Sequence, residues 1–139
     1  MKILFAVDGS DCTQRALDYL TTHQWPGAGS TLSVLTVVLQ VPHRAAALAG
    51  PNLVHLYYAD DAEQALRPVR ERLRHWPVPV DYSWVVGHPA QAIVNKAESG
   101  HFDLIIMGSH GHGALANVVL GSVATGVLAR CRIPVLLMR

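Results

Sequence analysis

The chain has little net charge, few cysteines and no long apolar run, and each shortage excludes a class of protein. Eleven Lys and Arg against ten Asp and Glu leave a net charge of +1, which indicates neither a nucleic-acid nor a membrane-surface partner. No apolar run approaches the roughly twenty residues that a membrane-spanning helix needs. The N-terminal apolar stretch is too short for a signal peptide and ends in an acid, Asp8. We therefore expect a cytoplasmic protein that binds neither nucleic acid nor membranes.

What the sequence has in quantity is apolar residues, half of the total, in runs that alternate with helical patterns. A chain of 139 residues can bury one full core, so we expect a single domain over residues 1–139. Apolar, β-branched runs predict five strands, at 2–8, 31–38, 80–86, 103–107 and 135–139. Helical periodicity predicts four helices, at 11–23, 59–76, 89–99 and 122–131.

Local signals refine two of these helices. Ser10 or Asp11 can cap the first helix, with Gln14 completing a capping box on Asp11. Pro68 lies inside the helix at 59–76 and should kink or restart it. The side of that helix away from its apolar stripe carries four arginines, which form either a solvated face, our preferred interpretation, or a basic binding face. These are Arg67, Arg70, Arg72 and Arg74.

Alternation of strands and helices predicts an α/β protein with a parallel sheet wrapped by helices. Five strands favour a doubly wound sheet in the order 3-2-1-4-5, with helices on both faces. Ligands bind such sheets outside the carboxyl ends of the strands, where the chain reverses direction. Here the reversal falls between the first and fourth strands, which end at Asp8 and at Met107-Gly108.

The two cysteines, Cys12 and Cys131, have no metal-ligand spacing. Right-handed crossovers place the first and last helices on opposite faces of the sheet, so a disulfide between them is implausible. We interpret both as reduced thiols of a cytosolic protein.

A glycine-rich stretch follows the fourth predicted strand. Two residues separate Gly108 from Gly111, and nine more precede Gly121-Ser122, where a helical pattern resumes. Glycine lets backbone N–H groups approach an anion, and a serine at a helix start adds a hydroxyl beside free N–H donors. The stretch therefore predicts a phosphate cradle facing Asp8. No lysine follows the glycines at the Walker spacing, so it is not a P-loop.

This glycine-serine spacing resembles that of the universal stress protein family. The likeness covers essentially the whole chain and includes four further segments. These are Val7-Asp8-Gly9-Ser10, Gly87-His88-Pro89-Ala90, the run from Asp103 to Gly111, and Pro134-Val135-Leu136-Leu137-Met138. Within the family this pattern marks the members that bind ATP. The resemblance implies a stress-response regulator or sensor that binds ATP, or AMP or ADP, with Mg²⁺.

The resemblance also implies which residues contact the nucleotide. Asp8 should contact ribose hydroxyls or a hydrated Mg²⁺ without ligating the metal directly, since it would repel bare phosphate. The backbone of Val37 reads adenine, and the helix start at Ser122 adds N–H groups. The full set is Ala6, Val7, Asp8, Val37, Met107, Gly108, Ser109, His110, Gly111, Gly121, Ser122, Val123 and Ala124.

The last predicted strand is a sheet edge, and an exposed apolar edge invites pairing. Its residues can pair antiparallel with their copy in a second chain across a two-fold axis. The resemblance supports a homodimer of this kind. The residues concerned are Val135, Leu136, Leu137 and Met138.

Two other functions remain open, a nucleotide-free dimeric interaction module and a slow ATP hydrolase. The sequence lacks a clear base, an arginine finger and a catalytic lysine at motif spacing, so at most a slow ATPase is expected. His110 and His112 could suggest metal ligands, but no third ligand is assigned. We interpret them as loop histidines bonded to backbone or phosphate.

One long connection, residues 39–58, contains Pro42, Gly50 and Pro51. Connections of this length are often functional lids. The alanine-rich piece at 44–48 can form a helical turn that covers a ligand, and the alternative is a disordered surface loop.

Overall fold

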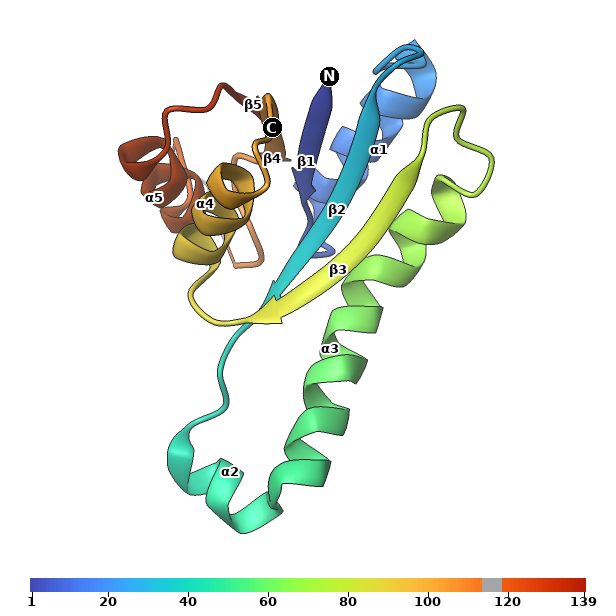
Figure 1. Ribbon diagram of the computed structural model, residues 1–139. Helices are drawn as coiled ribbons and strands as arrows, with labels where there is room; N and C mark the ends of the chain where they lie inside the picture. The colour runs from blue at the N-terminus through green and yellow to red at the C-terminus, as the bar shows by residue number, and fades with distance from the viewer. Residues whose placement is uncertain (114–118) are drawn as a thin grey trace.

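A computed structural model describes residues 1–113 and 119–139, and its centre is a five-stranded parallel sheet (Figure 1). The strand order is β3-β2-β1-β4-β5, as predicted, so the chain reverses between β1 and β4. The strands are mostly apolar, and β-branched residues, which favour extended backbone, are frequent in the second, third and fourth of them. The strands are β1 (Lys2–Ala6), β2 (Thr31–Val38), β3 (Val80–Val86), β4 (Leu104–Gly108) and β5 (Val135–Met138).

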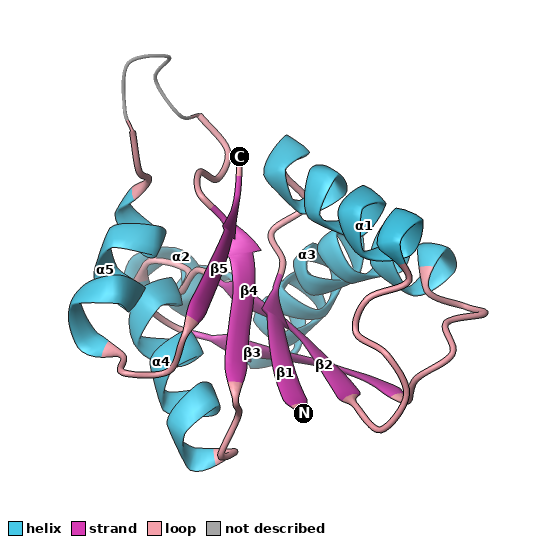
Figure 2. Cartoon of the chain, turned by 90° about the horizontal axis from the view of Figure 1, so that it is seen from above, coloured by secondary structure: helices cyan, strands magenta, loops and turns pink. Residues whose placement is uncertain are grey.

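Residues 1–113 and 119–139 form five helices, four of which cover the two faces of this sheet (Figure 2). They are α1 (Asp11–His23), α2 (His43–Ala49), α3 (Pro51–Arg72), α4 (Pro89–Ser99) and α5 (Ser122–Arg130). Helices α1 and α3 pack on one face, against Ile3 and Phe5 of β1. Helices α4 and α5 pack on the other face, against Leu4 and Ala6. Alternate residues of the central strand thus serve two cores, as the period of a strand requires.

The two cysteines follow this division. Cys12 begins α1 on one face and Cys131 follows α5 on the other, and both are free thiols. The prediction that they form no disulfide is confirmed.

The connection at 39–58 is mostly helical, which corrects the alternative of a disordered loop. The predicted turn at 44–48 is part of α2, and α3 starts at Pro51, eight residues before its predicted start at 59. Gly50 adopts a positive φ of 82° between the two helices, and Pro51 occupies the first turn, where its missing N–H costs nothing. Helix α2 buries no residue, and it extends with the first turns of α3 beyond the sheet (Figure 1).

Pro68 lies inside α3, and the helix does not restart there. The proline removes one donor, which leaves the carbonyl of Gln64 without its helical partner. Because Gln64 is exposed, water can satisfy that carbonyl. The helix ends at Arg72, four residues before the prediction, because Leu73 leaves the helical conformation while its side chain stays in the core.

Two smaller predictions at the start of α1 were also wrong. Strand β1 ends at Ala6, two residues early, and Asp8 lies in the loop that follows. Ser10 occupies the N-cap position, but its side chain makes no capping hydrogen bond, and its Oγ is buried without a partner among the described residues. The carboxylate of Asp8 instead accepts the Ser10 N–H.

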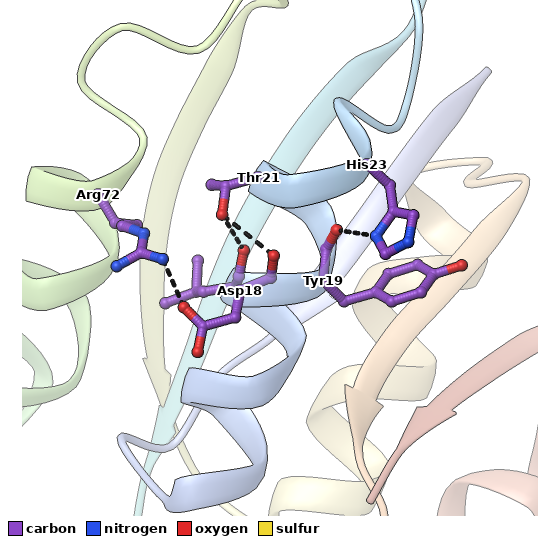
Figure 3. Close-up of polar contacts among 6 residues, drawn as sticks. Asp18, Tyr19, Thr21, His23 and Arg72 are labelled. Carbon is purple, nitrogen blue, oxygen red and sulfur yellow. Dashed lines mark hydrogen bonds and ion pairs between the residues drawn. The ribbon is translucent and has the colours of Figure 1, made fainter.

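The C-terminal part of α3 is tied to α1 by an exposed ion pair between Arg72 and Asp18 (Figure 3). Thr21 donates its hydroxyl proton to the carbonyl of Leu17 at 2.8 Å, inside α1. Such surface contacts contribute little to stability, typically below about 1 kcal/mol, so apolar packing holds the two helices together. Their buried residues include Leu17 and Leu20 from α1 and Leu66 and Val69 from α3.

Candidate functional site

A cavity of about 870 Å³ opens at the carboxyl ends of β1 and β4, where the chain reverses direction. Parallel strands bring the loops that follow them to this one edge of the sheet. All thirteen residues that the sequence assigned to nucleotide binding line this cavity. They are Ala6, Val7, Asp8, Val37, Met107, Gly108, Ser109, His110, Gly111, Gly121, Ser122, Val123 and Ala124.

Asp8 is held in place at the start of α1. Its Oδ1 accepts hydrogen bonds from the backbone N–H of Ser10 and from the hydroxyl of Thr13, both at 2.9 Å. The Thr13 Oγ1 also accepts the Asp8 N–H at 3.3 Å. The second oxygen, Oδ2, faces the glycine loop, since a Cβ on Gly111 would lie 2.8 Å from it. One carboxylate oxygen is therefore used for positioning, and the other lies beside the loop.

The glycines of the loop sit where a side chain would collide with neighbouring atoms. A Cβ on Gly108 would lie 2.6 Å from the Cβ of Cys12, and one on Gly121 would lie 3.2 Å from the carbonyl oxygen of Ser109. The Gly121 N–H donates to that same carbonyl at 2.7 Å. The Ser109 N–H donates to Met138 of β5, also at 2.7 Å. The loop backbone is thus packed closely against α1, β5 and the start of α5.

The start of α5 presents unpaired donors to the cavity. The first hydrogen bond of this helix runs from the Thr125 N–H to the Gly121 carbonyl, at 3.0 Å. The N–H groups of Ser122, Val123 and Ala124 therefore have no acceptor within the helix, and the helix dipole adds partial positive charge there. All three residues line the cavity, so this end of the site suits an anion.

The two loop histidines have different contacts. His112 Nε2 lies 2.7 Å from the backbone carbonyl of Asp8. A carbonyl can only accept, so the Nε2 of His112 carries the proton and donates it. The His110 Nδ1 lies 2.9 Å from the Ser109 hydroxyl. The interpretation of a loop histidine bonded to backbone therefore holds for His112, which joins the glycine loop to the end of β1.

Helix α3 supplies a wall of the cavity that the sequence analysis missed. Tyr57, Asp61 and Ala65 lie four residues apart on one helix face, and Gln64 lies beside them, so all four reach the same cavity. The Cα of Ala65 would be 3.7 Å from a Cβ on Gly9. The four-residue spacing was a usable signal, but residues 57 and 58 had been assigned to a loop.

Helix α4 contributes a further wall through Pro89 and Ile93. Its N-cap residue, His88, is exposed and is not among the cavity-lining residues. The first two turns of α4 pack against β2 and reach the cavity beside Val37.

The sequence model of the universal stress protein family matches residues 1–139 of this chain. The chain belongs to that family. It is 32% identical over 140 residues to universal stress protein Slr1230 of Synechocystis, covering 99% of this chain but only 42% of that protein. It is 30% identical over 146 residues to universal stress protein YxiE of Bacillus subtilis, covering 99% and 98%. Against the solved structure of protein MJ0577 of Methanocaldococcus jannaschii the TM-score is 0.83 at 28% identity, covering 99% and 94%.

The charge of this universal stress protein's cavity is distinctive. The described residues that line it include two carboxylates, Asp8 and Asp61, and neither lysine nor arginine. Residues 1–113 and 119–139 also hold no group of three or more His, Cys, Asp or Glu that could bind a metal ion. Nor does any helix in those ranges have the length and apolarity to cross a membrane. Among the described residues, the groups of this cavity that suit an anion are therefore the backbone N–H groups at the start of α5.

Proposed function

We propose that this universal stress protein binds an adenine nucleotide, namely ATP or its diphosphate or monophosphate, in the cavity between β1 and β4. The observation that carries the proposal is the meeting of the Gly108–Gly111 loop, the open N-terminus of α5 and Asp8 around one cavity. Its volume of about 870 Å³ lies within the range of small-molecule sites. Members of the same fold have been solved with cAMP, dAMP and AMP, with TM-scores of 0.68 to 0.70 and identities of 24% to 15%.

The two ends of the cavity suit the two ends of a nucleotide. Apolar side chains of Val37, Leu39 and Ile93 line one part, and they would contact the adenine ring. The N–H groups at the start of α5 would bind the phosphates, and Asp8 would accept hydrogen bonds from ribose hydroxyls. Mg²⁺ fits this arrangement through bound water, because Asp8 Oδ2 is the one oxygen of that carboxylate that Ser10 and Thr13 leave open. Magnesium bound there would offset the charge of the phosphates.

We propose a regulatory role for this binding, in which the nucleotide state of a cytoplasmic protein is sensed in the stress response. Among the described residues the cavity has no lysine or arginine to stabilise a phosphoryl-transfer transition state. Residues 114–118, which lie outside the described ranges, are uncharged in the sequence. Any ATP hydrolysis should therefore be slow.

We also propose that the protein is a homodimer formed through β5. This strand is an edge of the sheet, and its four residues are only half-buried in the single chain. Because the Met138 carbonyl accepts the N–H of Ser109, a residue of the glycine loop, pairing at β5 would lie directly beside that loop. Analytical ultracentrifugation should show a dimer, and a monomer at micromolar concentration would overturn this part of the proposal.

Calorimetric titration with ATP, with and without Mg²⁺, tests nucleotide binding directly. Asp8→Ala should weaken binding at least about tenfold, as expected when a hydrogen-bonding charged group is lost. Gly111→Ala should also weaken it, since its Cβ would displace the Asp8 carboxylate. Gly27→Ala is the matched control, because nothing lies within 4 Å of its Cβ. No binding of ATP, ADP or AMP at millimolar concentration would favour the nucleotide-free module instead.

A further inference from the structure

The outer edge of β3 exposes main-chain hydrogen-bonding groups at the side of the sheet opposite to β5. The Leu32 N–H donates to the Pro79 carbonyl, and the Gly87 N–H donates to the Val38 carbonyl. In a parallel ladder, these two bonds mean that the odd-numbered residues of β3 direct their N–H and C=O groups toward β2. The N–H and C=O groups of Val80, Tyr82, Trp84 and Val86 therefore point outward, and no described residue bonds to them.

This edge lacks the usual protection against pairing. Natural edge strands carry proline, lysine or a bulge, whereas β3 is seven residues of the sequence VDYSWVV without any of these. Its single charge, Asp81, is engaged with β2, because its Oδ1 accepts the Ser33 hydroxyl at 2.6 Å. Val85 and Val86 are 37% and 38% exposed. The strand is thus open to an additional strand along its length.

A groove of about 560 Å³ runs between this edge and the C-terminal half of α3. Its walls carry Arg67 and Arg70 from one face of α3 and Arg74 from the turn that follows the helix, together with Glu71 and the aromatic residues Trp76 and Tyr82. We refer to it as the arginine groove. Arg72, the last residue of α3, is paired with Asp18 of α1 (Figure 3) and does not line the groove. With Glu63, which pairs with Arg70, three arginines face two glutamates and leave the groove an excess of one positive charge.

Arg70 is held in a fixed orientation at the centre of the groove. Its Nη1 lies 2.7 Å from the Glu63 carboxylate, and its guanidinium lies 5.2 Å from the centre of the Tyr82 ring. The hydrogen bond with Glu63 raises the pKa of Arg70, so this charge persists. Arg67 and Arg74 are exposed, and no hydrogen bond or ion pair of theirs is seen within residues 1–113 and 119–139. Two of the three guanidinium groups are therefore available to a partner.

We propose that β3 and the arginine groove form a docking surface for an extended acidic segment of a partner protein. The segment adds as a sixth strand, and its backbone pairs with the outward N–H and C=O groups of β3. The side chains of Val80 and Tyr82 lie on the sheet face that α3 covers, so alternate side chains of an added strand lie beside the groove. Carboxylates at those positions meet Arg67 and Arg74, the two guanidinium groups without an ion pair among the described residues.

Charge complementarity favours this occupant over a second copy of the chain. If two copies paired through β3, their two arginine grooves would come together and repel each other. Asp81, the one charged residue of β3, would not offset this repulsion, because its carboxylate is already bonded to Ser33. A nucleic acid could use the arginines, but it has no use for the regular main-chain donors and acceptors of the edge. An extended acidic peptide uses both features.

The experiment uses the intact protein and a fluorescein-labelled octapeptide of four Glu-Val repeats, followed by fluorescence anisotropy. The peptide should bind saturably and more weakly as salt is raised. The Gln-Val and Lys-Val peptides of equal length should bind at least roughly tenfold more weakly, because charge-assisted contacts are lost or reversed. Equal binding of the Gln-Val peptide, or no binding of the Glu-Val peptide at millimolar concentration, would overturn the proposal.

Two further measurements separate strand addition from simple anion binding. Arg67→Gln with Arg74→Gln should weaken the Glu-Val peptide roughly tenfold, whereas Arg15→Gln with Arg44→Gln, the same charge change at exposed sites elsewhere, should not. Bound peptide should slow amide hydrogen exchange at Val80, Tyr82, Trp84 and Val86. Binding without that protection, or equal displacement by oligothymidylate, would identify a general anion surface and contradict strand addition.

Discussion

Gly108→Ala is the substitution whose effect can be worked out most fully from the structure. The new Cβ would lie 2.6 Å from the Cβ of Cys12 and 3.0 Å from the carbonyl oxygen of His110. Both neighbours are attached directly to backbone, so neither can rotate away, and the chain itself must shift. Gly108 is not among the glycines with positive φ, so the penalty is steric and not conformational.

Overpacking of this kind costs about 1–3 kcal/mol, and replacing a glycine recovers about 0.4–1 kcal/mol through the unfolded chain. We therefore expect the free energy of unfolding to fall by about 1–2 kcal/mol, measured by urea denaturation with circular dichroism. Gly27→Ala, which meets nothing within 4 Å, should leave the free energy unchanged or raise it slightly.

A double-mutant cycle identifies the cause of this loss. Cys12→Gly removes the atom that Gly108→Ala would strike, so the loss on adding Gly108→Ala should be smaller in the Cys12→Gly background than in the wild type. Equal losses in both backgrounds, or no loss in either, would refute the steric argument and the close packing of the loop on α1.

Other predictions test the walls of the site and the surface. Asp61→Asn should strengthen magnesium-free ATP binding about fivefold more than it strengthens AMP binding, because the two extra charges of ATP, at about 8 Å in water, are worth about 1 kcal/mol. Unchanged affinities by calorimetry would show that Asp61 does not repel the phosphates. His112→Ala should cost less than about 1 kcal/mol in urea denaturation yet weaken ATP binding, because it releases the Asp8 carbonyl. Burial raises the pKa of Tyr82, because it disfavours the charged phenolate. The neutral phenol therefore contributes stability at pH values below its ordinary pKa of 10.0, and this contribution is lost as the pH rises through the pKa of Tyr82 in the folded protein. Tyr82→Phe should therefore reduce the alkaline loss of stability, and an unchanged pH profile would contradict this. Asp18→Asn should cost below about 1 kcal/mol by the same denaturation assay, since its pair with Arg72 is exposed.

The sheet was predictable because its strands are short apolar runs separated by helical patterns. Their order followed from general rules on parallel sheets, and the sheet has that order. Helix α4 was predicted with its bounds correct, because Pro89 and Gly100 mark its ends. The convergence of Asp8 with the glycine loop also followed from the strand order alone.

The part that failed was the segment between β2 and β3. Pro42, Gly50 and Pro51 indicate turns when each is considered alone, but Gly50 and Pro51 together separate α2 from a longer α3. The exposed leucines of this segment gave no clear helical stripe, because the first turns of α3 have no core to face. For the same reason, the sequence did not predict that Tyr57 and Asp61 line the cavity.

Nucleotide binding at the β1–β4 cavity is the central claim, and the molecule that copurifies with the protein tests it most directly. Protein purified without added nucleotide would be denatured, and the released small molecules identified by mass spectrometry and counted per chain. We predict a substoichiometric or full complement of ATP, ADP or AMP, lost in Asp8→Ala and retained in Gly27→Ala. Equal amounts from both variants, or no nucleotide together with no binding of added ATP, would contradict the account.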